Sequence, residues 1–170
     1  MSRCKLSKPL LLLMATTLAG CELANPKPSA SLAHYQLEGH AVRLVVGQQQ
    51  RVGSDTIKLL QQQQADLDGD GVPERIGVLT LTGGGSGYFY YVAASRWQHN
   101  QWRSAGTLFL GDRIRFERLQ LIDSVNGALG AVQLSYWHRG PEQPMAAPAR
   151  LRVEQQFQLA PEQPLAAMPK

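Results

Sequence analysis

The chain has 170 residues, with 17 Lys and Arg, 13 Asp and Glu, two cysteines and a formal net charge of +4 at pH 7. Three of the basic residues, Arg3, Lys5 and Lys8, lie at its start, and 17 less these three leaves 14 basic against 13 acidic residues. Proteins that bind nucleic acids carry a clustered excess of basic residues. The near balance of charges gives no such excess, so nucleic-acid binding is not expected. The length suits one domain with its own core.

The first 21 residues have the pattern of an export signal. Basic residues precede an apolar run over residues 10–19, and small residues follow as far as Cys21. Such a run is too short to span a bilayer, so we expect a cleaved signal peptide over residues 1–20. The sequence Leu18-Ala19-Gly20-Cys21 resembles the lipobox of bacterial lipoproteins, which implies acylation of the Cys21 thiol. The alternative is an ordinary signal peptide with an incidental cysteine.

Acylation of Cys21 would anchor the protein in a membrane, because two or three acyl chains hold a protein there stably. In the lipoprotein sorting pattern an Asp after the cysteine retains the protein at the inner membrane. Here that residue is Glu22, which favours the outer membrane, on its periplasmic side. Residues 21–33 contain two prolines and no apolar period, and we interpret them as the lipidated cysteine and a flexible tether. A single β domain is then expected over residues 34–170, without a disulfide.

From residue 34 the chain alternates short apolar segments with turn signals. Residues 57–65 are ambiguous between a short helix and a strand, and the glutamine runs 48–50 and 61–64 are interpreted as solvated edges. The apolar parity slips near Glu117-Arg118, which predicts a β-bulge. Asn126-Gly127 is typical of a hairpin turn. Strands are expected over residues 42–46, 76–82, 88–97, 107–110, 113–122, 128–137 and 151–159.

The number and spacing of these segments predict the fold class. About eight or nine strands, with turns roughly every ten residues and little helix after the signal peptide, indicate an all-β protein. We expect an antiparallel β-sandwich or a half-open barrel. The alternation is cleanest over residues 151–159, where Leu151, Val153, Phe157 and Leu159 are expected to face the core.

The most informative segment is the acidic loop, defined as residues 66–74, which reads Asp-Leu-Asp-Gly-Asp-Gly-Val-Pro-Glu. Calcium prefers six to eight hard oxygen ligands, and carboxylates at loop positions 1, 3, 5 and 9 can converge on one ion. The expected ligands are Asp66, Asp68, Asp70 and Glu74, with the carbonyl of Val72. Position 12 is Gly77, so the loop lacks the bidentate glutamate of a helix-loop-helix site. It resembles the calcium loops of integrin-type propeller repeats, which lead directly into a strand.

The alternative is a solvated turn without metal, because Asp and Gly also favour turns. Three aspartates within five residues repel one another without a cation, and this favours calcium in a structural role. An ion held in this way would fix the entry of the following strand.

Residues 83–87 are rich in glycine but are not followed by the Lys-Ser/Thr of a phosphate loop, so a wide hairpin turn is expected. The aromatic strand that follows, residues 88–97, has aromatic side chains on both of its faces. Ser86, Gly87, Tyr88 and Tyr90 form a possible surface for an envelope protein or small ligand. Asp112 and Arg113 are expected to be a structural turn pair or salt bridge. No catalytic residue is assigned and the protein is expected not to be an enzyme, although His138 and Asp112, with Ser86 or Ser135, stay open as a hydrolytic group.

Four segments in this order resemble a family of uncharacterised bacterial envelope lipoproteins: the acidic loop over residues 66–71, the Gly-Gly-Ser-Gly-aromatic segment 84–91, Leu-Gly-Asp-Arg at 110–113 and residues 144–148. The similarity covers about residues 41–159. It implies an exported domain, sometimes found beside small β domains such as lysozyme-inhibitor types, and it implies no particular activity. Relatives can carry cysteines where this chain has Ala146 and Ala147, so a thiol role is not expected there. The alternative function is an envelope binding module or an inhibitor-type lipoprotein that uses the aromatic strand and the Gly-rich loop, and the third is a hydrolase.

Overall fold

The computed structural model describes residues 32–122, 130–140, 142–144 and 146–169. These residues contain eleven strands and no helix, and every pair of neighbouring strands is antiparallel. The three sheets do not close into a barrel, so the all-β, sandwich-like prediction is confirmed. The predicted signal peptide, Cys21, residues 22–31 and the Asn126-Gly127 turn lie outside the described residues.

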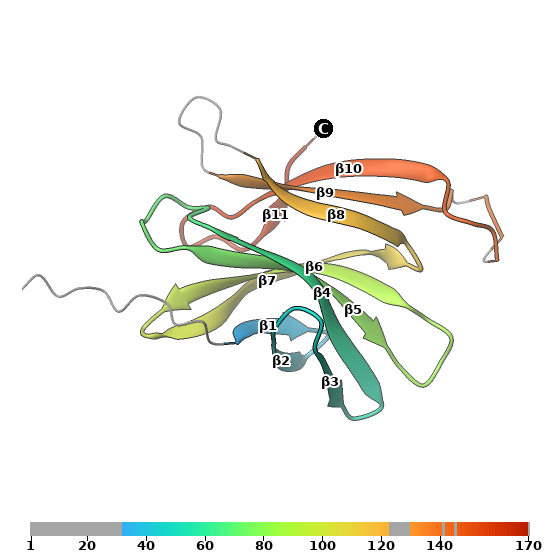
Figure 1. Ribbon diagram of the computed structural model, residues 1–170, viewed down its shortest axis with the longest axis horizontal. Coiled ribbons are helices and arrows are strands. Elements are labelled where there is room, and N and C mark those ends of the chain that lie inside the picture. The colour runs from blue at the N-terminus through green and yellow to red at the C-terminus, as the bar shows by residue number, and fades with distance from the viewer. Residues whose placement is uncertain (1–31, 123–129, 141, 145, 170) are drawn as a thin grey trace, which may run out of the picture.

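The strands form three layers (Figure 1). The middle layer is a five-stranded sheet in the order β3 (Gln49–Val52), β4 (Asp55–Ala65), β5 (Glu74–Thr82), β6 (Phe89–Gln98) and β7 (Gln101–Asp112). Above it in Figure 1 lies a four-stranded sheet in the order β11 (Ala166–Ala167), β10 (Leu151–Gln158), β9 (Ala131–His138) and β8 (Arg115–Ile122). Below it lies the hairpin of β1 (Ala33–Leu37) and β2 (His40–Leu44).

The centre of the middle sheet is buried on both faces, as its central strand β5 shows. Every residue of β5 from Glu74 to Leu81 is buried. Ile76 and Val78 pack toward the four-stranded sheet, whereas Leu79 and Leu81 pack toward the β1–β2 hairpin. A strand covered on both faces is apolar almost continuously rather than at alternate positions. This explains why β5 shows no clean alternation in the sequence.

The glutamine run in β4 joins two layers, and its assignment as a solvated edge was wrong. The side chain of Gln61 donates to the carbonyl of Leu119 in β8 at 2.8 Å and accepts from its N–H at 3.0 Å. The amide of Gln63 donates to the same carbonyl at 3.0 Å. Residues 57–65 are strand because they pair antiparallel with β5, and the side chains of Gln61 and Gln63 bridge from the middle sheet to the edge of the next one.

Several predicted boundaries differ from the structure. Strand β1 begins at the fully buried Ala33, one residue before the predicted start of the β domain. Strand β7 is much longer than the predicted residues 107–110, because two irregularities in its pairing with β6 interrupt the alternation by which the rest of the strand could have been recognised. Leu151 was predicted to face the core but is 48% exposed, since it lies at the end of its sheet. The bulge near Glu117-Arg118 is confirmed by the register shift between β8 and β9.

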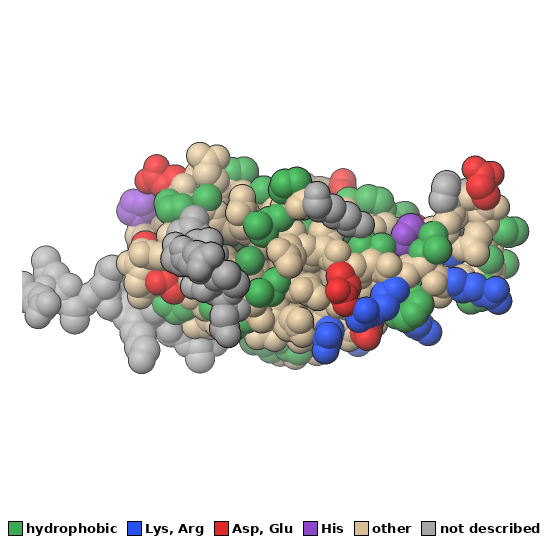
Figure 2. All heavy atoms as spheres, turned by 90° about the horizontal axis from the view of Figure 1, so that it is seen from above, with side chains coloured by type: hydrophobic (Ala, Val, Ile, Leu, Met, Phe, Trp, Pro, Cys, Tyr) green, Lys and Arg blue, Asp and Glu red, His purple; other side chains and the backbone are tan. Residues whose placement is uncertain are grey.

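The outer face of the four-stranded sheet is a solvated surface. Figure 2 shows it from above, with basic and acidic side chains lying beside one another. Arg152 forms ion pairs with Glu117 at 3.1 Å and Glu154 at 2.7 Å. All three side chains are more than a third exposed, so these pairs contribute little to the free energy of folding.

Candidate metal centre

The acidic loop connects β4 to β5, and its own carboxylates organise its backbone. Asp66 accepts hydrogen bonds from the N–H of Gly69 at 2.7 Å and of Gly71 at 2.9 Å, one on each carboxylate oxygen. Gly69 and Gly71 have φ angles of +81° and +83°, which side chains other than glycine rarely adopt. The two glycines therefore allow the tight path that wraps the backbone around Asp66.

Three of the loop's carboxylates come together. Asp66, Asp68 and Glu74 each offer an oxygen, and these oxygens lie within 4.8 Å of one another. Two ligands about 2.4 Å from one calcium ion are at most about 4.8 Å apart, so the spacing of the three oxygens is compatible with a shared ion. Each carboxylate has several lone pairs, so the hydrogen bonds from backbone amides do not prevent Asp66 from binding a metal as well.

Glu74 is the most unusual member of this group because its side chain is fully buried. Its Oε2 accepts from the N–H of Leu67 at 2.8 Å. Its Oε1 has no hydrogen-bond partner among the described residues. A buried carboxylate oxygen without a partner is costly, and native structures seldom keep one without a reason.

The electrostatics of the group are dominated by negative charge. Burial, together with the nearby Asp68 and Asp70, raises the pKa of Glu74 to about 7 against the opposing effect of the Leu67 N–H and Arg96. Burial also raises the pKa of Asp68, as does Asp70. Among the described residues, Arg96 is the cation that pairs with this group. Its Nε lies 3.1 Å from Asp68 Oδ2, and its Nη2 donates to the carbonyl of Ala160.

The two other expected ligands are placed differently. Asp70 is outside the group of three, and its Oδ1 accepts from the N–H of Val72 at 2.7 Å. The hydrogen bond between Val72 and Asp70 thus uses the N–H of Val72, whereas its carbonyl was the expected calcium ligand. Arg96 was not identified from the sequence, because it lies in β6 and only the pairing of β5 with β6 brings it to the loop.

Asp112 and Arg113 fix the Gly-rich loop of residues 83–87. The N–H of Tyr88 donates to Asp112 Oδ1 at 2.9 Å, and the N–H of Arg113 donates to the carbonyl of Tyr88 at 2.7 Å. The guanidinium of Arg113 donates to the carbonyl of Ser86 and, at 3.0 Å, to its hydroxyl. The Nε of Arg113 is 3.9 Å from Asp112, so the main partner of both side chains is the neighbouring loop rather than each other.

The expected partner surface is accessible in part. Ser86 is exposed and Tyr88 is 37% exposed, whereas Gly87 and Tyr90 are half-buried. The rings of Tyr88 and Tyr90 lie 5.3 Å apart. On the opposite face of the sheet, Phe109 is 58% exposed, which the sequence analysis did not single out.

The hydrolytic group considered above is only partly assembled. His138 and Asp112 line the same cleft, which has a volume of about 290 Å³. Neither serine lines it, since the Ser135 side chain is fully buried and Ser86 is bound to Arg113. The cleft therefore holds a possible base and a carboxylate, without either of the two expected nucleophiles.

Comparisons with known proteins find no match. No family model, no curated protein and no solved structure is similar to this chain. In the described part of the chain, no helix has the length and apolar character needed to cross a membrane.

Proposed function

We propose that the protein is a non-catalytic, lipid-anchored envelope domain whose acidic loop binds a structural calcium ion. The single observation that carries the calcium site is the fully buried Glu74, whose Oε1 lacks a partner among the described residues and belongs to a group with Asp66 and Asp68. A cation bound to the three carboxylates would supply that partner.

A turn without metal accounts for only part of the arrangement. It explains why Asp66 and Asp70 accept hydrogen bonds from loop amides. It does not explain Glu74, which the loop buries beside two other carboxylates. Arg96 offsets one negative charge at Asp68, and a divalent cation would offset the remaining repulsion. Calcium suits hard oxygen ligands in a loop of this kind better than the softer transition metals.

The expected result of calcium binding is a higher unfolding temperature. For the mature protein in detergent, with a dissociation constant on the order of 0.1 mM, 1 mM calcium adds about 1.4 kcal/mol of stability relative to EDTA. This corresponds to a rise of roughly 3–6 °C for a domain of this size. Differential scanning calorimetry would measure the shift, with 1 mM magnesium as the metal control.

Two variants make this measurement specific to the loop. Asp66→Asn should abolish the calcium response, since it removes one charged oxygen of the group of three. Asp55→Asn should retain it, since Asp55 lies elsewhere and pairs with His40 at 3.3 Å. An unchanged unfolding temperature of the wild type at millimolar calcium would refute the calcium site.

The lipid anchor is proposed from Leu18-Ala19-Gly20-Cys21 and is tested independently. In a bacterial host we expect the wild type to incorporate labelled palmitate and to sediment with the outer membrane, because two or more acyl chains bind membranes stably. Cys21→Ser should lose both the label and the membrane association. Glu22→Asp should keep the label and move the protein to the inner membrane. A wild-type protein without label would contradict the anchor.

The alternative function is a binding module, and the exposed aromatic side chains favour it. Phe109 is 58% exposed, although its ring contacts that of Tyr91 at a centroid distance of 5.3 Å. Aromatic side chains exposed on a sheet are typical of contact surfaces. An envelope protein or small ligand could bind there, or at Tyr88 beside the Gly-rich loop.

A further inference from the structure

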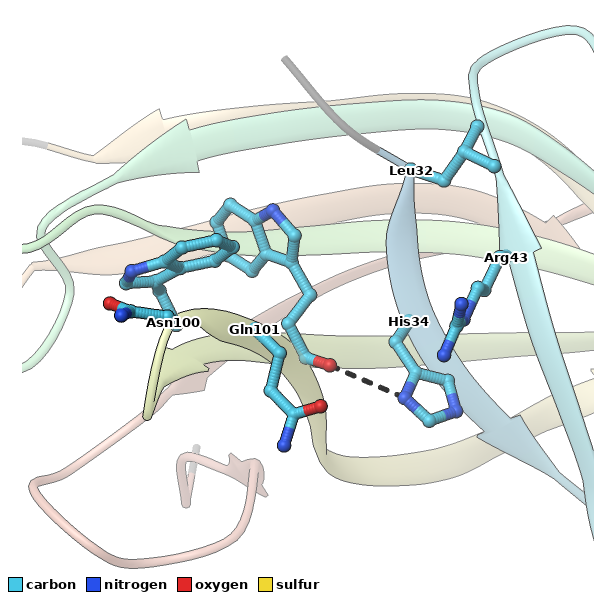
Figure 3. A pocket seen from close by; sticks show the side chains of 7 residues that line it. Leu32, His34, Arg43, Asn100 and Gln101 are labelled. Carbon is cyan, nitrogen blue, oxygen red and sulfur yellow. Dashed lines mark hydrogen bonds between the residues drawn. The ribbon is translucent and has the colours of Figure 1, made fainter. Parts of the chain in front are cut away.

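We propose that the cleft between the β1–β2 hairpin and the β6–β7 turn binds an acidic saccharide. Its carboxylate would bind Arg43 and one of its sugar rings would pack on Trp97. The cleft has a volume of about 460 Å³, within the usual range for small-molecule sites. Figure 3 shows His34 and Arg43 together on one side, and Asn100 and Gln101 on the other.

The side of the cleft formed by the hairpin favours a negatively charged group. Arg43 lies directly opposite His34 in the pairing of β1 with β2, and its guanidinium has no partner among the described residues. None of the described residues that line the cleft is acidic. A guanidinium can bind both oxygens of a carboxylate at once, which makes Arg43 the natural site for the acid group.

A hydrogen bond selects one tautomer of the His34 ring, which lies beside Arg43. Its Nδ1 lies 3.3 Å from the carbonyl oxygen of Trp102 (Figure 3). A carbonyl oxygen can only accept, so Nδ1 carries the hydrogen and donates it. In the neutral ring Nε2 is then an acceptor, which suits a ligand hydroxyl.

The opposite side provides an aromatic ring and two amides. The rings of Trp97 and Trp102 meet edge to face at a centroid distance of 5.4 Å. Trp102 is 5% exposed and is covered by the guanidinium of Arg75, 4.1 Å from the centre of its ring. The half-buried Trp97 is therefore the indole with surface left for a ligand. Sugar rings have apolar faces that pack on such surfaces.

The amides complete the site because each can both donate and accept, as sugar hydroxyls do. In its hydrogen-bonded orientation, Gln101 accepts from Arg103 Nε at 3.1 Å and Nη2 at 2.7 Å. This leaves its NH₂ group to donate to a ligand. Asn100 is exposed at the tip of the turn. A simple anion would use only Arg43, and one exposed guanidinium gives little affinity by itself, whereas an acidic saccharide uses the guanidinium, the indole and the amides together.

The test is isothermal titration of the mature protein with trimers of galacturonic, glucuronic and mannuronic acid. It is performed in EDTA, since uronates bind calcium and could otherwise act through the acidic loop. We expect at least one trimer to bind with a dissociation constant below about 1 mM. Arg43→Gln and Trp97→Ala should each weaken binding about tenfold, by loss of the charged pair and of the ring contact.

Matched controls come from a second arginine–tryptophan pair on the four-stranded sheet. Arg115 lies 4.7 Å from the ring centre of Trp137, and Arg115→Gln and Trp137→Ala should leave binding unchanged. Methyl esterification of the trimer should weaken binding as much as Arg43→Gln does. Arg43 is exposed, so this variant should fold normally even if Trp97→Ala is less stable.

Three results would overturn the proposal. The first is that none of the trimers binds at about 10 mM. The second is that the methyl ester binds as tightly as the acid, which would leave no role for Arg43. The third is that inorganic phosphate displaces the trimer at equal concentration, which would make the cleft a general anion site.

Discussion

Glu74→Gln is expected to raise the unfolding temperature of the calcium-free protein at pH 8 and to abolish the response to calcium. Burial raises the pKa of Glu74 from 4.5 to about 7. Between these two pH values the folded protein holds a proton on Glu74 that the unfolded chain has released. The stability from this proton is fully present below pH 4.5 and is lost as the pH rises through 7. Integrated over that interval, the loss is on the order of 2–3 kcal/mol.

Glutamine removes this loss because it is neutral and similar in shape. Its amide oxygen can still accept from the N–H of Leu67, and its NH₂ group can donate toward the carboxylates of Asp66 and Asp68. In EDTA the variant should therefore exceed the wild type by roughly 5–10 °C at pH 8 and by little at pH 4.5.

Unfolding temperatures measured from pH 4.5 to 8 in EDTA, followed by calcium addition at pH 8, test both parts. Glu117→Gln is a suitable control, since that carboxylate is on the surface and pairs with Arg152. Parallel pH profiles for the wild type and Glu74→Gln would show that this carboxylate does not titrate as proposed. A normal calcium response in the variant would remove Glu74 from the site.

Gln61→Leu is expected to lower stability by about 1–3 kcal/mol, or roughly 3–8 °C in the unfolding temperature. The substitution preserves the approximate size of the side chain but removes both of its hydrogen bonds to Leu119. The N–H of Leu119, at the edge of β8, then loses the Gln61 side-chain oxygen as its acceptor. The middle sheet and the four-stranded sheet would lose their polar connection at this place.

Gln63→Leu should have a smaller effect, because the carbonyl of Leu119 would keep the hydrogen bond from Gln61. Gln158→Leu, on the exposed side of β10, should change stability by less than about 0.5 kcal/mol. Urea unfolding of the three variants gives the comparison. Equal losses for Gln61→Leu and Gln158→Leu would show that the bridge contributes nothing.

Local patterns in the sequence were sufficient for much of this architecture. Hairpin turns and the parity slip at Glu117-Arg118 depend on neighbouring residues, and such signals predicted the all-β class and the bulge. The acidic loop was equally readable, since Asp66, Asp68 and Glu74 lie within nine residues and a single turn brings their oxygens together. Its metal content stays a prediction.

The tertiary structure alone decided how the layers meet. The sequence does not indicate that Gln61 reaches Leu119, that Arg96 reaches Asp68, or that β5 is covered on both faces. It also does not bring Arg43 to Trp97 across the cleft. Each of these arrangements brings together residues that are distant in the chain. Side-chain periodicity reports only which face of a strand a residue occupies. Local sequence patterns determined most of the strands and the acidic loop, whereas packing between sheets determined which polar side chains are buried and which surfaces remain open to a ligand.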